Sequence, residues 1–255
     1  MNDEAFLETI RQNPEDDAPR LVYADWLEEQ GDIRAEFLRL EVQWAHGKRA
    51  QLNAPILKRM EKLRAEIEPN WLAWVERAKR FSVYWSNETC GTLVINGEMG
   101  NPLRFVGHAL RYREPSRLLE VYRGAYLYPI TVFNRRLMVI GRMRVREATT
   151  LAAFATARPD QARLLPHAAI QCVLIGEGGT PQRLDRVMPL PAVSRLTFRH
   201  NGKERMLNHL RNGELMHSVE LQGTFQLTQC TAMDFERLLA GLPFPDLPEE
   251  AGLFT

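Results

Sequence analysis

Cysteine is scarce in this 255-residue chain, which has only Cys90, Cys172 and Cys230. Their number is odd and no two of them form a CxxC pair, which argues against a disulfide framework and against a cysteine-bound zinc site. Reduced thiols are typical of the cytoplasm. We therefore expect a cytoplasmic protein, and the sequence indicates no metal and no cofactor.

Long hydrophobic runs are also lacking. No stretch approaches the ~20 apolar residues that a membrane-spanning helix requires. The acidic first residues, Met1 to Glu4, lack the apolar segment of a secretory signal peptide. The net charge is only +1, from 33 basic and 32 acidic residues, so no global field draws the chain onto nucleic acid or an anionic membrane. We expect no membrane partner.

Recognisable catalytic motifs are missing as well. No Ser-His-Asp, Cys-His or paired-carboxylate pattern has characteristic spacing. The glycine-rich residues 176–180 match neither the dinucleotide-binding nor the P-loop pattern and are interpreted as a loop. In the predicted strands, His209 and His217 point to opposite faces, so that hairpin alone cannot bring them to one metal. An enzyme of an unrecognised class stays an alternative that rests on chain length alone.

What the sequence does contain begins with helical periodicity in residues 1–80. Helices are predicted from about Asp3 and after Asp17, an N-cap followed by Pro19 in the first turn, with Gly31 ending the second helix. Further helices are predicted over about 33–46 and 56–67, and over 70–78 with Asn70 as the cap. The residues predicted to form the apolar faces are Phe6, Leu7, Ile10, Leu21, Val22, Trp26, Leu27, Ile33, Phe37, Leu40, Trp44, Ile56, Met60, Leu63 and Ile67.

One segment of this helical part is long and unusual. Residues 16–32 contain Pro-Arg-Leu-Val-Tyr-Ala-Asp-Trp-Leu-Glu-Glu, and Arg-Ala-Glu-Phe-Leu-Arg-Leu follows at 34–40. With Asp-Glu-Ala-Phe-Leu at 3–7 and Asn-Pro at 13–14, this segment resembles the bacterial repeat-companion domain over about residues 3–44. The resemblance implies a short helical module at the start of diverse bacterial proteins, with no assigned catalytic activity. Such modules often precede repeat arrays, and none follows here.

A docking face for a partner protein is predicted within this segment, formed by Tyr23, Trp26, Glu28 and Glu29. Tyrosine and tryptophan are favoured at interface hot spots. The alternative is that the charged residues of the segment are structural and pair across the helices, Arg20 with Asp25 and Asp32 with Arg34.

The pattern changes near residue 81 to the period of strands. Strands are predicted at 81–85, 92–95, 126–132, 137–145 and 168–175, and helices at about 150–157, capped by Thr149 or Thr150, and 232–240. The Asn-Gly pairs at 201–202 and 212–213 favour two-residue hairpins. They predict a β-meander of strands 194–200, 203–211, 214–221 and 223–228. Its predicted cross-strand pairs are Arg199 with Glu204, Arg205 with Glu220, Met206 with Val219, Leu210 with Leu215 and Arg211 with Glu214.

The fold class that these patterns predict is α+β. A helical N-terminal module over residues 1–80 is followed, over residues 81–255, by a mostly antiparallel β domain with a few helices and a C-terminal β-meander. The resemblance to a known family does not extend into the second part.

A set of arginines gives the β-rich part a candidate site for binding phosphates. Arg142, Arg144 and Arg146 alternate along a predicted strand, so all three are expected on one face, with Arg135 and Arg136 nearby. Such a stripe suits a nucleic-acid backbone. The alternative is a solvated sheet face whose arginines pair with acids from elsewhere in the chain.

The leading functional hypothesis is a non-enzymatic adaptor that binds another protein within a larger bacterial assembly. The alternative is a nucleic-acid-binding subunit that uses the arginine-rich strand face.

Overall fold

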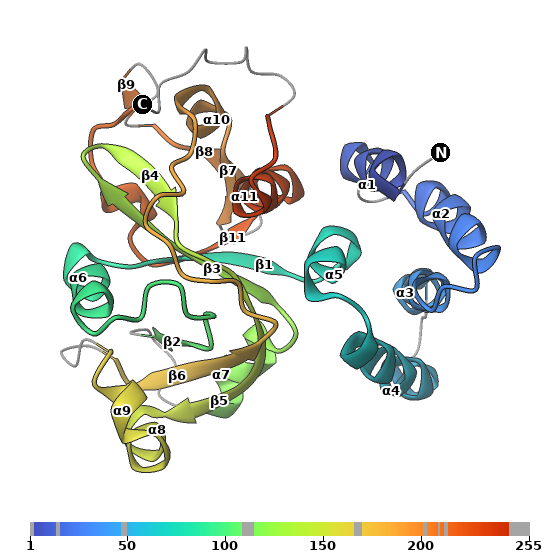
Figure 1. Ribbon diagram of the computed structural model, residues 1–255, viewed down its shortest axis with the longest axis horizontal. Coiled ribbons are helices and arrows are strands. Elements are labelled where there is room, and N and C mark those ends of the chain that lie inside the picture. Colours follow the sequence, from blue (N-terminus) through green and yellow to red (C-terminus); the bar gives the residue numbers. More distant parts are fainter. Residues whose placement is uncertain are drawn as a thin grey trace. The chain divides into compact units, whose positions relative to one another are not determined.

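The structure, a computed structural model, describes residues 3–13, 16–46, 50–108, 115–165, 170–200, 203–208, 210–211 and 214–244. The chain divides into two compact units, Met1–Arg77 and Ala78–Thr255. The fold class is α+β, as predicted, with helices first and a mixed, mostly antiparallel sheet after them (Figure 1). Within the described ranges, no helix combines the length and apolar character needed to cross a membrane.

The first unit is built from helices. They are α1 (Asp3–Gln12), α2 (Ala18–Glu28), α3 (Arg34–His46), α4 (Ala50–Glu66) and α5 (Pro69–Val75). Gly31 follows α2 with φ +69°, the left-handed conformation that glycine tolerates best. The cap of α5 is Glu68 rather than the predicted Asn70, because the Glu68 carboxylate accepts hydrogen bonds from the backbone N–H groups of Asn70 and Trp71.

The buried faces of α2 and α3 differ from the predicted ones. Leu21 and Val22 are 39% and 56% exposed, and Ile33 and Trp44 are also exposed. Phe37 is buried as predicted. The residues that α2 and α3 bury are Arg20, Tyr23, Ala24, Leu27, Ala35, Phe37, Leu38 and Glu41. The hydropathy pattern misidentified this face because it contains two charged residues, Arg20 and Glu41, whose partners lie elsewhere in the chain.

In α4 the prediction was better, since Met60, Leu63 and the following Ile67 are all buried. They contribute to a core that Trp71 and Trp74 of α5 also enter. The helical spacing of large apolar residues therefore identified the inner face of α4, although half-buried Arg64, which pairs with Glu76, lies beside these residues.

The second unit contains a twisted mixed sheet. Its strands are β1 (Arg80–Tyr84), β2 (Phe105–His108), β3 (Tyr126–Phe133), β4 (Arg136–Val139), β5 (Met143–Thr150), β6 (Cys172–Glu177), β7 (Thr197–His200), β8 (Lys203–Met206) and β11 (Thr224–Leu227). Their order is β2-β6-β5-β3-β1-β11-β7-β8, with β4 paired to β3. Strands β1 and β3 are parallel, and every other described strand pair is antiparallel.

Helices of the second unit pack against this sheet (Figure 1). They are α6 (Asn87–Ile95), α7 (Pro115–Tyr122), α8 (Leu151–Ala157), α9 (Pro159–Ala162), α10 (Leu190–Ser194) and α11 (Gln229–Ala240), with a short 3-10 helix at Val219–Leu221. Leu93 of α6 and Leu118 of α7 join Phe81, Leu127 and Leu174 of the strands in one buried cluster. This cluster fixes α6 on the sheet, and α6 in turn forms a wall of the pocket described below.

Two of the predicted strands have a different structure. Residues 92–95 are the last part of α6, not a strand, because Ser86 caps that helix and starts it five residues earlier. The predicted strand 137–145 is split into β4 and β5, and between them the Arg142 backbone N–H donates to Thr180 Oγ1. Of the two predicted caps, Thr149 and Thr150, the structure has Thr150, whose hydroxyl accepts a hydrogen bond from the Ala153 backbone N–H at 3.1 Å.

The meander forms only in part. Arg199 lies opposite Glu204, and the short strands β9 (Leu210–Arg211) and β10 (Glu214–Leu215) pair in the predicted register. The pairs Met206 with Val219 and Arg205 with Glu220 are wrong: Met206 lies opposite Thr197, and 219–221 is helical. Glu220 instead accepts a hydrogen bond from the Asn208 backbone, outside the main sheet. Both Asn-Gly pairs, together with His209, lie outside the described residues.

Candidate functional site

A pocket of about 550 Å³ opens beside edge strand β2 in the second unit. This volume lies in the range of ligand-binding cavities, roughly 300–1,000 Å³. The described residues that line it are Tyr84, Trp85, Ser86, Glu88, Thr89, Leu93, Glu98, Leu103, Arg104, Phe105, Gly107, Leu164, Leu165, Ile170, Gln182 and Gln222. The middle of the pocket is apolar, so it can accept a hydrocarbon or aromatic group.

One wall is the junction of β1 with α6. The strand runs into the helix with only Trp85 and Ser86 between them. Ser86 Oγ accepts from the Thr89 backbone N–H at 3.2 Å and lies 3.0 Å from Thr89 Oγ1. This cap stabilises the first turn of α6 and holds Glu88 at the mouth of the pocket.

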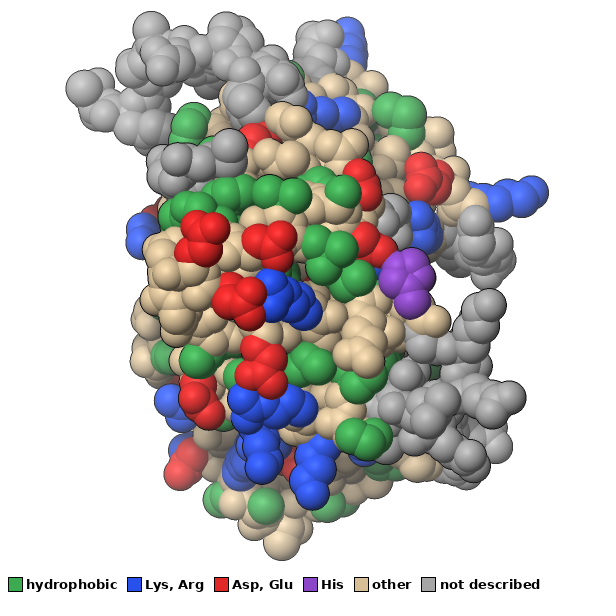
Figure 2. Space-filling view, turned by 90° about the vertical axis from the view of Figure 1, so that its right-hand side faces the viewer, with side chains coloured by type: hydrophobic (Ala, Val, Ile, Leu, Met, Phe, Trp, Pro, Cys, Tyr) green, Lys and Arg blue, Asp and Glu red, His purple; other side chains and the backbone are tan. Residues whose placement is uncertain are grey.

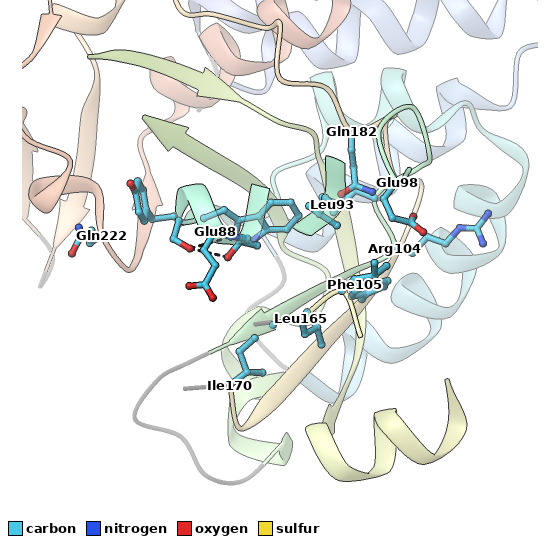
Figure 3. Close-up of a pocket in the computed structure, with 16 residues that line it drawn as sticks. Glu88, Leu93, Glu98, Arg104, Phe105, Leu165, Ile170, Gln182 and Gln222 are labelled. Carbon is cyan, nitrogen blue, oxygen red and sulfur yellow. Dashed lines mark hydrogen bonds between the residues drawn. The ribbon is translucent and has the colours of Figure 1, made fainter. Parts of the chain in front are cut away.

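The opposite wall depends on a glycine. A side chain at Gly107 would place its Cβ 2.4 Å from Ile170 Cδ1 and 3.1 Å from Leu165 Cδ2. Because glycine occupies this position in β2, Ile170 and Leu165 can pack directly over the strand. Figure 3 shows these two side chains across the pocket from α6, with Phe105 beside them.

Polar groups lie at the two ends of the pocket. Glu88 and Gln222 are at one end, and Gln182, Glu98 and Arg104 are at the other (Figure 3). Gln182 is 5% exposed, and its backbone is fixed by hydrogen bonds with Asn101 and Gly100. Its Nε2 donates a long bond of 3.4 Å to the Asn101 carbonyl. Its Oε1 accepts no hydrogen bond from any described residue, and Gln182 lines the pocket, so this oxygen can accept a bond from an occupant.

The arginine face predicted from the sequence does not form. Arg142 is 1% exposed, and its guanidinium donates to Glu236 of α11 at 2.6 Å. Arg144 lies 3.3 Å from Glu177, and Arg146 occupies a β-bulge that breaks the alternation of side chains along β5. The expectation that Arg142, Arg144 and Arg146 share one exposed face is therefore wrong.

The other two arginines lie at the β3–β4 hairpin. Asn134 and Arg135 both have positive φ, at 48° and 61°, as a type I′ turn requires. Arg135 is exposed and its guanidinium is 3.9 Å from Glu214, whereas Arg136 is half-buried opposite Phe133. The five predicted arginines therefore do not share one surface: Arg142 is buried, Arg144 and Arg136 are half-buried, and Arg146 and Arg135 are exposed.

The Arg142 contact belongs to a buried network. Tyr128 donates to Glu236 Oε1 at 2.7 Å while Arg142 bonds Oε2, so both carboxylate oxygens are satisfied. Burial raises the pKa of Tyr128, and the Glu236 charge raises it further. Because both oxygens of the buried Glu236 carboxylate accept hydrogen bonds from the sheet side, this network has a structural role in joining α11 to the sheet.

The four residues of the docking face predicted on α2 do not form one exposed surface. Tyr23 is fully buried, and its hydroxyl donates to Asp3 and accepts from Trp71 Nε1. Trp26 is half-buried, with its ring centroid 5.2 Å from that of Phe6. Tyr23 therefore belongs to the core and offers no surface to a partner.

The two acids of that predicted face are exposed. Glu28 makes a bidentate ion pair with Arg39, with both hydrogen bonds at 2.6 Å, while Glu29 follows the last turn of α2. Figure 2 shows a face of the molecule on which acidic and basic side chains lie next to one another and alternate with hydrophobic ones. Of the two charge pairs predicted in this segment, Asp32 with Arg34 is confirmed, whereas Arg20 instead contacts Glu41 and the carbonyls of Asp16 and Val75.

A buried carboxyl group stands out in the helical unit. Glu41 is 1% exposed, and its Oε1 accepts from the Arg77 backbone N–H at 2.6 Å. Its Oε2 lies 3.7 Å from Arg20 Nε, too far for a hydrogen bond. Burial, reinforced by the nearby Glu76 charge, raises the pKa of Glu41 to about 7. Desolvation outweighs the attraction of Arg20 because the two side chains share no hydrogen bond.

Metal and thiol chemistry find little support in the described part of the chain. Among these residues, no group of three or more His, Cys, Asp or Glu side chains is placed to hold a metal ion. The three cysteines form no disulfide there, and burial raises the pKa of the Cys90 thiol. Gly179 of the glycine-rich loop packs so closely on Leu103 that an added Cβ would lie 1.8 Å from its carbonyl oxygen, which gives this glycine a packing role.

The sequence interpretation missed the pocket altogether. Its walls come from segments as far apart as Tyr84 and Gln222, and most of the lining residues are ordinary apolar ones. One local signal was available: Ser86, followed by Glu88 and Thr89, is a helix-start pattern. Assigning residues 92–95 to a strand concealed it.

No protein-family model, curated protein or solved structure was found to match this chain. The resemblance of residues 3–44 to the repeat-companion domain stays a prediction.

Proposed function

We propose that this chain is a non-enzymatic adaptor, and that its second unit binds an apolar segment of a partner protein in the pocket beside β2. The observation that carries this proposal is the pocket itself, with an apolar middle of Leu93, Phe105, Leu165 and Ile170 between two polar ends. An elongated apolar site of this kind suits a large side chain and the backbone on either side of it.

The pocket is the better candidate site because charged side chains buried elsewhere in the chain pair with one another. Arg142 with Glu236, and Arg64 with Glu76 at 2.5 Å, are buried ion pairs that join secondary-structure elements. Such pairs are not open to a substrate. The nucleic-acid alternative is less well supported, because the arginines on which it rests do not form a common surface.

The test is affinity capture with three forms of the full chain: wild type, Ile170→Trp and Ile95→Trp. Tryptophan at Ile170 fills the pocket, whereas Ile95 is 85% exposed at the end of α6 and outside the pocket lining, so it is the matched control. Each form is checked for its thermal unfolding midpoint, incubated with native lysate with and without nuclease, and analysed by mass spectrometry.

We expect a stoichiometric protein partner that survives nuclease, binds wild type and Ile95→Trp equally, and is lost with folded Ile170→Trp. A partner that Ile170→Trp retains would place docking elsewhere on the chain and overturn the pocket proposal. Material that is released by nuclease would favour the nucleic-acid alternative. A small molecule that copurifies with wild type but not with Ile170→Trp would favour an enzyme or a ligand-binding protein.

A further inference from the structure

We infer that the segment bound in the pocket carries a lysine or arginine beside its bulky apolar side chain, and that Glu88 pairs with this cation. This inference rests on the proposed docking function and adds the chemistry of the partner. It follows from how charge is distributed along the pocket.

Glu88 is the isolated charge. It is exposed in the first turn of α6, and within the described residues its carboxylate makes no ion pair or hydrogen bond. Figure 3 shows this carboxylate pointing into the space between α6 and the segment that carries Leu165 and Ile170. The N-terminal end of a helix stabilises a negative charge at this position. An occupant of the pocket therefore meets a carboxylate at this end.

The opposite end is balanced. Glu98 and Arg104 both line this end, so it carries one carboxylate and one guanidinium, whose formal charges cancel (Figure 3). Glu98 also accepts a hydrogen bond from Asn101 Nδ2 at 3.1 Å, which restrains it. Summed over the lining residues that the structure describes, two carboxylates and one guanidinium leave one negative charge, which we assign to the unpaired Glu88.

The Gln182 side-chain amide at this opposite end suits the backbone of a peptide. Gln182 Oε1 is held by a side chain that is 5% exposed, and it has no described donor. A backbone N–H of the bound segment is a suitable donor for it. Gln182 would then hold the backbone of the bound segment, and the apolar middle of the pocket would take its large side chain. A neighbouring lysine or arginine of the segment can lay its aliphatic stem along the apolar wall and reach Glu88.

The experiment uses a phage-displayed library of random dodecapeptides selected on the full-length protein. Enriched peptides are synthesised, and their affinities are measured by fluorescence polarisation at low and high salt. The variants are Glu88→Gln, Glu88→Lys, the control Arg104→Gln at the balanced end, and Ile170→Trp to block the pocket.

We expect enriched peptides to combine a bulky apolar residue with a basic residue at a constant spacing. Glu88→Gln should weaken binding about fivefold at low salt, as for a solvent-accessible ion pair, and Glu88→Lys should weaken it by more than about tenfold. High salt should reduce both effects, and Arg104→Gln should leave the preference for a basic residue in place.

Failure of the inference can be told apart from failure of the proposed function. Peptides that need an open Ile170 pocket but lack a basic residue, or bind Glu88→Gln as tightly as wild type, would overturn the role of Glu88 and leave docking intact. Peptides that bind Ile170→Trp equally well, or the absence of any enrichment, would overturn both.

Discussion

Replacing Glu41 by glutamine should make the helical unit more stable at alkaline pH than the wild type. Burial raises the pKa of Glu41 from 4.5 to about 7 in the folded state. Between these two pH values the folded protein therefore holds a proton that the unfolded chain releases. The contribution of Glu41 is most favourable below pH 4.5 and is lost as the pH rises to about 7.

The size of the effect follows from the shift. At 1.36 kcal/mol per pKa unit, the change from 4.5 to about 7 corresponds to about 3 kcal/mol. Glutamine resembles the protonated carboxyl group and does not titrate. The unfolding free energy of Glu41→Gln minus that of the wild type should thus be small near pH 4.5 and should rise by about 3 kcal/mol by pH 8.

Tryptophan fluorescence during urea unfolding is a suitable assay, because four of the five tryptophans, Trp26, Trp44, Trp71 and Trp74, lie in the first unit. Glu28→Gln is the control of opposite sign. The hydrogen-bonded Arg39 lowers the pKa of Glu28, so the wild type should gain stability over that variant as the pH rises. If the wild type also gained stability over Glu41→Gln with rising pH, the ion pair with Arg20 would outweigh desolvation and the reasoning would be refuted.

Three further predictions concern stability, each measured by thermal unfolding followed by circular dichroism. Glu236→Ala leaves Arg142 buried without its carboxylate partner and should cost about 3–5 kcal/mol; a loss below 1 kcal/mol would contradict the network. Gly91→Ala has open space inside α6 and should stabilise by about 1 kcal/mol, whereas Gly179→Ala meets the Leu103 carbonyl and should cost about 2 kcal/mol or more, so equal effects would contradict the packing argument. Thr150→Ala removes the cap of α8 and should lower the unfolding free energy by about 1 kcal/mol, whereas Thr150→Ser keeps a capping hydroxyl and should lose little.

The sequence by itself determined the features that depend on neighbours in the chain. Helix punctuation at Gly31 and Thr150, the inner face of α4, and the opposed residues Arg199 and Glu204 all follow from local spacing and backbone preference. The two-part α+β organisation was predictable for the same reason, because the hydrophobic period changes near residue 81.

Only the tertiary structure decided which charged side chains are buried and where the pocket lies. Arg20, Glu41 and Arg142 are buried beside partners that are distant in sequence, and no local pattern encodes such partners. The pocket arises where α6, β2 and Gln182 converge across about a hundred residues of chain. Each of its residues is ordinary in its own segment, and it is their convergence in the folded chain that creates the cavity and leaves Glu88 at its mouth.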